Sequence, residues 1–180
     1  MEGYDFVVWF WNFVVYSFLG FLLEVTFARM TGGRPGRKCL LVLPLCPVYG
    51  LGACAILLLP SWVASVPLLL SLGGALAATA AEYLMALFYE EVLGVSFWDY
   101  RELPGNIQGR VCLPFSLAWG LLSLPLVYWV HPALSPLLQA IPRPVTWLAL
   151  ATLLADALLS GLLLRRTGNR NCLQWYAVRE

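Results

Sequence analysis

The chain has 180 residues, of which 61% are hydrophobic and only 12% are charged, and its formal net charge is +1. Soluble domains carry about 25% charged residues, so this composition excludes an ordinary soluble domain. It predicts an all-α integral membrane protein, with residues 1–180 as a single transmembrane domain surrounded by membrane lipids. The basic residues form no stripe interleaved with aromatic residues, which excludes nucleic acid as the expected partner.

Five stretches are long and apolar enough to span a membrane, because about 20 mainly apolar residues cross about 30 Å of hydrocarbon. They are residues 6–28, 40–59, 66–88, 111–130 and 145–164. The first five residues contain no basic residue, so we interpret the first stretch as a span rather than a cleavable signal.

The basic residues predict the orientation of these spans, since cytoplasmic loops are enriched in lysine and arginine. With five spans, ten of the eleven basic residues fall on one side and only Arg143 falls on the other. The ten are Arg29, Arg34, Arg37, Lys38, Arg101, Arg110, Arg165, Arg166, Arg170 and Arg179. We therefore expect the N-terminus outside and the C-terminus in the cytoplasm.

The second span is interrupted near its start by Pro44 and Pro47. Proline disrupts a helix interior but suits a first helical turn, so we expect the regular helix to begin at Pro47. From there to Pro60 the helix is too short to cross the hydrocarbon alone. Residues 40–46 are then expected to be irregular at membrane depth, which requires a covering of protein or a wet cavity.

Polar and small residues four apart mark one face of the first span: Asn12, Tyr16, Gly20 and Glu24. Such a face should turn inward, because lipid disfavours polar side chains. Similar inward faces are expected on the third, fourth and fifth spans.

The acids Glu24, Glu82 and Asp156 lie at or near membrane depth. One hypothesis is structural: they pair with Arg101, Arg110 or backbone donors. The other is functional: they form a cation, proton or hydrogen-bonding site for a polar substrate. Both hypotheses stay open at this stage.

Three further features predict packing rather than chemistry. The small-residue run from Gly73 to Ala81 favours close helix contact, either within the bundle or at the seam of a homodimer. The five cysteines are odd in number and form no Cys-x-x-Cys pair, so we expect neither a disulfide framework nor a metal site, and no cofactor. His131 precedes Pro132 and is expected in a loop.

The loop between the third and fourth spans contains Trp98, Asp99, Asn106 and Arg110. The last three are groups that cap helices or hold a ligand, whereas Trp98 also suits an interfacial anchor. We predict that Glu24, Glu82 and Arg110 converge on one cavity near the cytoplasmic end, with Arg110 paired to an acid and Asn106 ordering the loop. The full predicted substrate-binding set is Glu24, Tyr49, Glu82, Glu90, Trp98, Asp99, Asn106 and Arg110.

Several motifs occur in a specific order along most of the chain. They are Glu24 before a basic loop, Pro44-x-Cys46-Pro47-x-Tyr49-Gly50-x-Gly52, Glu82 and Glu90, Trp98-Asp99-Tyr100, Pro104-x-Asn106-x-x-Gly109-Arg110 and Ser116-x-x-Trp119-Gly120. Together they resemble the ABC-transporter type IV family, also called CmpB-like. The sequence differs from the family pattern at Leu43, where glycine is usual, and at Arg101, where a small polar residue is common.

The resemblance implies a bacterial inner-membrane protein of the permease type. The chain contains no Gly-x-x-x-x-Gly-Lys-Ser/Thr loop, so any ATPase is expected to be a separate subunit.

Two functions remain open. The first is a transport component for a small polar or cationic solute. The second is a membrane-embedded enzyme or lipid-binding protein at the cytoplasmic headgroup level, with an acid/base pair drawn from Glu24, Glu82 and Asp99. It ranks second because no nucleophile constellation accompanies these acids. A structural scaffold is a third alternative.

Overall fold

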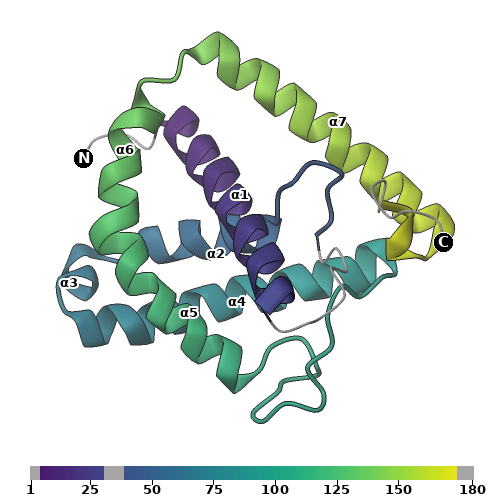
Figure 1. Ribbon diagram of the computed structural model, residues 1–180, viewed down its shortest axis with the longest axis horizontal. Coiled ribbons are helices and arrows are strands. Elements are labelled where there is room, and N and C mark those ends of the chain that lie inside the picture. Colours follow the sequence, from purple (N-terminus) through teal and green to yellow (C-terminus); the bar gives the residue numbers. More distant parts are fainter. Residues whose placement is uncertain (1–4, 31–38, 174–180) are drawn as a thin grey trace.

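The computed structural model in Figure 1 describes residues 5–30 and 39–173. Within these ranges the secondary structure is helical, apart from one isolated bridge between Ile107 and Val111. The helices are α1 (Phe6–Met30), α2 (Pro47–Leu57), α3 (Ser61–Ala64), α4 (Pro67–Leu93), α5 (Leu113–Pro125), the π-helical turn η1 (Leu126–Val130), α6 (His131–Gln139), α7 (Arg143–Thr167) and the 3₁₀ turn η2 (Arg170–Leu173). The predicted all-α membrane fold is confirmed.

The number of membrane-length helices is four in the described residues, so the prediction of five was wrong. They are α1, α4, the continuous stretch Leu113–Gln139 that joins α5, η1 and α6, and α7. The predicted span 40–59 supplies only the 11-residue α2. This helix begins at Pro47, as expected, because a proline needs no hydrogen-bonded N–H in the first turn.

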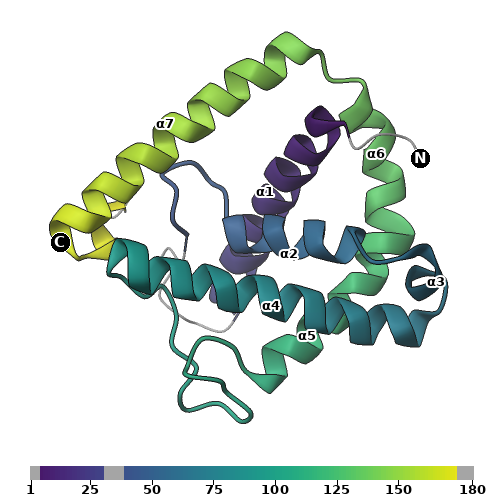
Figure 2. The same cartoon turned by 180° about the vertical axis from the view of Figure 1, so that it is seen from behind.

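The long helices form an open triangular outline in which α1 crosses the interior and α2 lies alongside α4 (Figures 1 and 2). The starts of α1 and α7 are adjacent, since the rings of Phe6 and Trp147 lie 6.0 Å apart. The ends of α4 and α7 meet through Leu93 and Leu164 in one buried cluster. Helices α1 and α7 therefore start together, α4 and α7 end together, and α2 packs against both α1 and α4.

The irregular segment before α2 is held by Asp156 in the middle of α7. Its two carboxylate oxygens accept hydrogen bonds from the backbone N–H of Val42, at 3.0 Å, and of Leu43, at 2.8 Å. The hydroxyl of Ser160 also donates to Asp156, at 3.1 Å. Backbone donors without water need such partners, so Asp156 has a structural role here, and the predicted irregular segment is confirmed.

A disulfide joins Cys39 and Cys46, which corrects the expectation that the cysteines would be unpaired. The two residues are seven apart in the sequence, and the irregular segment folds back so that their Cα atoms lie 5.0 Å from each other. This pairing depends on the path of the backbone, so the absence of a Cys-x-x-Cys motif does not exclude it. Cys54, Cys112 and Cys172 are free.

The small-residue run of α4 packs inside the chain. A Cβ added at Gly74 would lie 2.5 Å from Cβ of Ser123 in α5, and Ala78 is fully buried. A Cβ added at Gly120 of α5 would lie 2.7 Å from the carbonyl oxygen of Ser71. This close packing of α4 on α5 is the within-bundle alternative expected for this face, and the homodimer stays a prediction.

His131 lies within a continuous helical stretch rather than in a loop, which corrects that expectation. Pro132 occupies the first turn of α6, where its missing N–H is tolerated after the π-helical turn. The Nδ1 atom of His131 lies 3.0 Å from the hydroxyl of Tyr16 in α1, which gives this histidine an interhelical packing role.

Candidate functional site

A cavity of about 220 Å³ lies among α1, α2, α4, α5 and the loop after α4; we call it the acidic cavity. Two carboxylates line it, those of Glu24 and Glu82. Its aromatic lining consists of Phe27, Tyr49, Trp98, Tyr100, Phe115 and Trp119. Among the described residues 5–30 and 39–173, no lysine, arginine or histidine lines it, and its two charged lining residues are both acids.

Glu82 is the most buried acid of this cavity, with 5% of its surface exposed. It belongs to the buried face of α4, whose members recur every three or four residues, so the helix periodicity turns it inward. Its Oε2 accepts a hydrogen bond from Nε1 of Trp119 at 3.0 Å, and its Oε1 accepts one from the hydroxyl of Tyr100 at 3.1 Å. Both donors are neutral, so hydrogen bonds hold this carboxylate without an opposite charge.

Glu24 faces the same cavity from α1 and is half-buried. Its Oε1 accepts a hydrogen bond from the hydroxyl of Tyr49 at 2.8 Å. The Tyr49 ring approaches α1 closely because Gly20 has no side chain, and a Cβ added there would overlap the Cβ and ring of Tyr49. On its other side the Tyr49 ring lies 5.1 Å from the Trp119 ring. Tyr49 thus contacts both Glu24 and Trp119, which is the residue that donates to Glu82.

Tyr100 reaches the cavity from the loop, where its ring stacks on Phe115 with centroids 4.9 Å apart. Burial, and next the charge of Glu82, raise the pKa of Tyr100 well above the ordinary value of a tyrosine. The phenol therefore stays protonated at physiological pH and acts as a donor to Glu82.

Asn106 orders the loop that presents Trp98 and Tyr100. Its amide nitrogen donates to the carbonyls of Arg101 and Leu103, both at 3.0 Å, and its oxygen accepts from the N–H of Gly109 at 3.3 Å. The turn needs glycine at 109, where φ is +73° and a Cβ would approach Oδ1 of Asp99 to 2.7 Å. Asn106 itself does not line the acidic cavity.

A second cavity of about 750 Å³ lies in the same loop region; we call it the loop cavity. Arg110 lines it and forms a salt bridge with Glu90, with Nη2 and Oε2 2.7 Å apart. Arg110 also contacts Gln108 and lies over the ring of Tyr83, 5.3 Å from its centroid. Asp99 lines this cavity as well.

The prediction that Glu24, Glu82 and Arg110 surround one cavity is therefore wrong for Arg110. Glu90 lies eight residues beyond Glu82 along α4, at the more hydrated end, where a guanidinium loses less solvation. Trp98 and Tyr100 line both cavities. The part of the loop that carries these two residues therefore lies between the acidic cavity and the loop cavity. The expected pairing of Arg110 with an acid and the ordering of the loop by Asn106 are found.

Sequence reasoning did not place Tyr100, Phe115 and Trp119 in the site. A buried carboxylate near membrane depth needs donors, and Trp119 lies beside the small residue Gly120 of the polar face expected on α5. That combination is the signal that could have identified the indole.

The family comparison covers most of these residues. The model of the family described as "Putative ABC-transporter type IV" matches residues 11–160. The chain belongs to this family. Glu24, Tyr49, Glu82, Tyr100 and Trp119 all lie within the matched range. Comparisons with curated proteins and with solved structures gave no match. The family and the four long apolar helices together describe a transport-related membrane protein.

Proposed function

We propose that the chain is a permease-type transport component that binds a small polar or cationic solute in the acidic cavity. The observation that carries this proposal is that Glu24 and Glu82 line one cavity together with six aromatic rings, and that the part of its lining that the structure describes includes no basic side chain. The hydrogen bonds from Tyr49, Tyr100 and Trp119 come from neutral donors, so they bring no opposite charge to these acids. A cation is the occupant that offsets their charge.

The aromatic lining supports the same choice of solute. A cation over the face of an aromatic ring gains about 0.5–1 kcal/mol at exposed sites and about 2 kcal/mol or more when desolvated. Carboxylates at a partly screened site attract a unit charge at 4 Å by about 4 kcal/mol. An anion would gain neither contribution, which disfavours anionic solutes.

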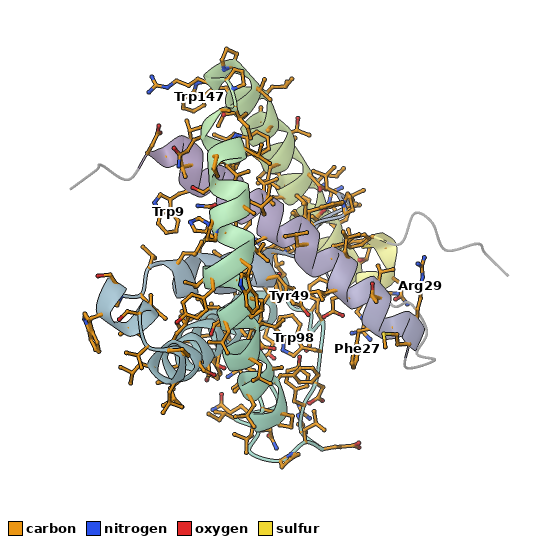
Figure 3. All side chains as sticks on the ribbon, turned by 60° about the vertical axis from the view of Figure 1, so that its left-hand side comes forward. Trp9, Phe27, Arg29, Tyr49, Trp98 and Trp147 are labelled. Carbon is orange, nitrogen blue, oxygen red and sulfur yellow. A yellow bond between two sulfur atoms is a disulfide. The ribbon has the colours of Figure 1, made fainter. Side chains whose placement is uncertain are left out.

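The orientation of the site follows the basic residues. Arg101 and Arg110 lie in the loop beside the acidic cavity, and Arg165 and Arg166 end α7. Figure 3 places Trp9 and Trp147 toward the start of α1 and Arg29 at its far end. We infer a bacterial inner-membrane protein with the N-terminus outside, the C-terminus in the cytoplasm and the acidic cavity on the cytoplasmic side.

An energy source would come from another subunit. The sequence contains no Gly-x-x-x-x-Gly-Lys-Ser/Thr loop, so ATP hydrolysis of that type requires a separate ATPase. The loop from 94 to 112 is the place where we expect such a subunit to act, because Trp98 and Tyr100 connect it directly to the acidic cavity.

Binding is tested by isothermal titration of the purified protein in lipid nanodiscs with tetramethylammonium and with acetate. Tetramethylammonium should bind and acetate should not. Glu82→Gln and Glu24→Gln should each weaken binding at least tenfold. The matched control is Glu91→Gln, because Glu91 is an exposed acid on the same helix and lines neither cavity.

Transport is tested by exchange of labelled for unlabelled tetramethylammonium across proteoliposomes, which requires no ATPase. Wild type and Glu91→Gln should exchange the cation, and Glu82→Gln should not. Equal binding of acetate, or unchanged binding in Glu82→Gln, would contradict the site; binding without exchange would contradict the transport role.

A further inference from the structure

A third cavity, of about 140 Å³, adjoins the acidic cavity; we call it the apolar groove. It is lined by residues of α1, α2, α5 and η1, most of them apolar, including Ala53, Ile56 and Leu126. Four residues line both cavities: Leu23, Tyr49, Trp119 and Leu122. The acidic cavity and the apolar groove are thus neighbouring parts of one elongated space, with charge at one end only.

The walls of this space reach the surface of the molecule. Leu23 is 47% exposed, Phe27 is 56% exposed and Leu122 is 38% exposed, although all three line the acidic cavity. They belong to α1 and α5, and Figure 3 shows Phe27, Tyr49 and Trp98 in the angle between these helices. In a membrane protein an exposed apolar surface at this depth faces lipid, so a ligand can enter from the bilayer side.

We infer that the solute is an amphiphilic organic cation, with its ammonium group in the acidic cavity and its alkyl chain in the apolar groove. This inference rests on the proposed function and specifies its substrate class. The aromatic rings and the two carboxylates match the charge of an ammonium group, and the groove matches the apolarity of an alkyl chain. A phospholipid fits less well, because the lining residues within 5–30 and 39–173 include no basic side chain to receive a phosphate.

The sizes of the two parts set what is expected. Taking about 30 Å³ for each water-sized group, the acidic cavity holds about seven such groups and the apolar groove about five. A trimethylammonium head therefore fits the first part, and a chain of a few methylenes fits the second. Each methylene transferred from water should raise the affinity about fourfold until the groove is full.

The experiment measures the affinity of alkyltrimethylammonium ions from methyl to decyl, in nanodiscs, by isothermal titration. Affinity should rise with chain length and level off near hexyl, whereas simple partition into the bilayer would continue to rise. Hexanesulfonate, with the same chain and opposite charge, should not bind. A flat series, a series that never levels off, or equal binding of hexanesulfonate would overturn the inference.

Two substitutions separate the groove from the acidic cavity. Leu126→Trp fills the groove and should leave the affinity for tetramethylammonium unchanged. The ratio of the affinity for hexyltrimethylammonium to that for tetramethylammonium should fall at least tenfold in this variant. Leu121→Trp is the control, because Leu121 is 67% exposed and lines neither part. If tetramethylammonium binding depends on Glu82 but chain length has no effect on affinity, the solute is not an amphiphile, and the proposed function still stands. Failure of tetramethylammonium to bind would reject the proposed function itself.

Discussion

The indole Nε1 of Trp119 donates a hydrogen bond to Oε2 of Glu82 at 3.0 Å, which ties the most buried acid of α4 to helix α5. The rest of the acidic cavity is arranged around this contact, since Trp119 also packs on Tyr49. Removing the donor while keeping an aromatic ring isolates its contribution.

We therefore predict that Trp119→Phe lowers the free energy of unfolding by about 1–3 kcal/mol, because a buried carboxylate oxygen loses its partner. The measurement is equilibrium unfolding by denaturing detergent, followed by circular dichroism. Trp129→Phe serves as the control, because Trp129 is 68% exposed. Equal stability of the two variants would show that the indole donor does not stabilise Glu82.

A second prediction concerns Gly20, whose missing side chain makes room for Tyr49. The Cβ introduced by Gly20→Ala would overlap Cβ and the ring of Tyr49, and overpacking of this kind costs about 1–3 kcal/mol. We expect Tyr49 to be displaced from Glu24 and tetramethylammonium affinity to fall at least fivefold.

The control for Gly20 is Gly161→Ala in α7. A Cβ at Gly161 would meet only Leu93 Cδ2, at an ordinary contact distance of 3.7 Å. This change should be neutral or stabilising by up to about 1 kcal/mol, because alanine favours helix over glycine. If both alanine variants have the same tetramethylammonium affinity and the same unfolding free energy, the close approach of Tyr49 to α1 does not contribute to binding.

A third prediction concerns Asp156, which accepts hydrogen bonds from two N–H groups of the irregular segment. Hydrogen bonds to a charged group contribute about 1.5–3 kcal/mol each, so Asp156→Ala should be strongly destabilising. Asp156→Asn keeps one acceptor oxygen and should lose about half as much. Thr152→Val, an exposed position of the same helix, should change the unfolding free energy by less than about 0.5 kcal/mol. A similar loss in Thr152→Val would argue against the capping role.

Local patterns in the sequence predicted much of this arrangement. The four-residue spacing on the first span and the position of Glu82 correctly placed both acids toward the interior, because helix periodicity and the cost of polar groups in lipid act on residues close in sequence. The helix start at Pro47 likewise depends only on proline chemistry. Each of these features needs no knowledge of the tertiary path.

Features that depend on how distant parts of the chain come together in the fold were not predicted. The partner of Arg110 is decided by where the loop turns, and this turn brings it to Glu90 rather than Glu82. The pairing of Cys39 with Cys46 and the two hydrogen bonds to Asp156 depend on the path of the irregular segment. Spacing rules do not describe contacts between residues 113 or 114 positions apart.

A fourth prediction concerns the orientation of the chain. Helices α4 and α7 end beside each other, so reporters inserted after Gly94 and after Gly168 should report the same, cytoplasmic side. A reporter in the segment between α6 and α7, near Arg143, should report the outside. Cysteine accessibility labelling in intact cells provides an independent measurement. Opposite sides for Gly94 and Gly168 would contradict the arrangement.

The last prediction follows from the protonation of Tyr100. Burial and the neighbouring Glu82 raise the pKa of Tyr100 above its unfolded value of about 10, so the folded protein retains the phenol proton when the unfolded chain releases it. The stability that this provides is complete below about pH 10 and is lost as the pH rises toward the folded pKa. Above pH 10 the unfolding free energy of wild type should therefore fall with pH more steeply than that of Tyr100→Phe. The two slopes should differ by up to about 1.4 kcal/mol per pH unit. At pH 7 the variant should be less stable, because Glu82 loses a donor. Detergent unfolding at pH 7 to 11 measures both effects, and parallel pH profiles would show that Tyr100 is not the protonated donor of the acidic cavity.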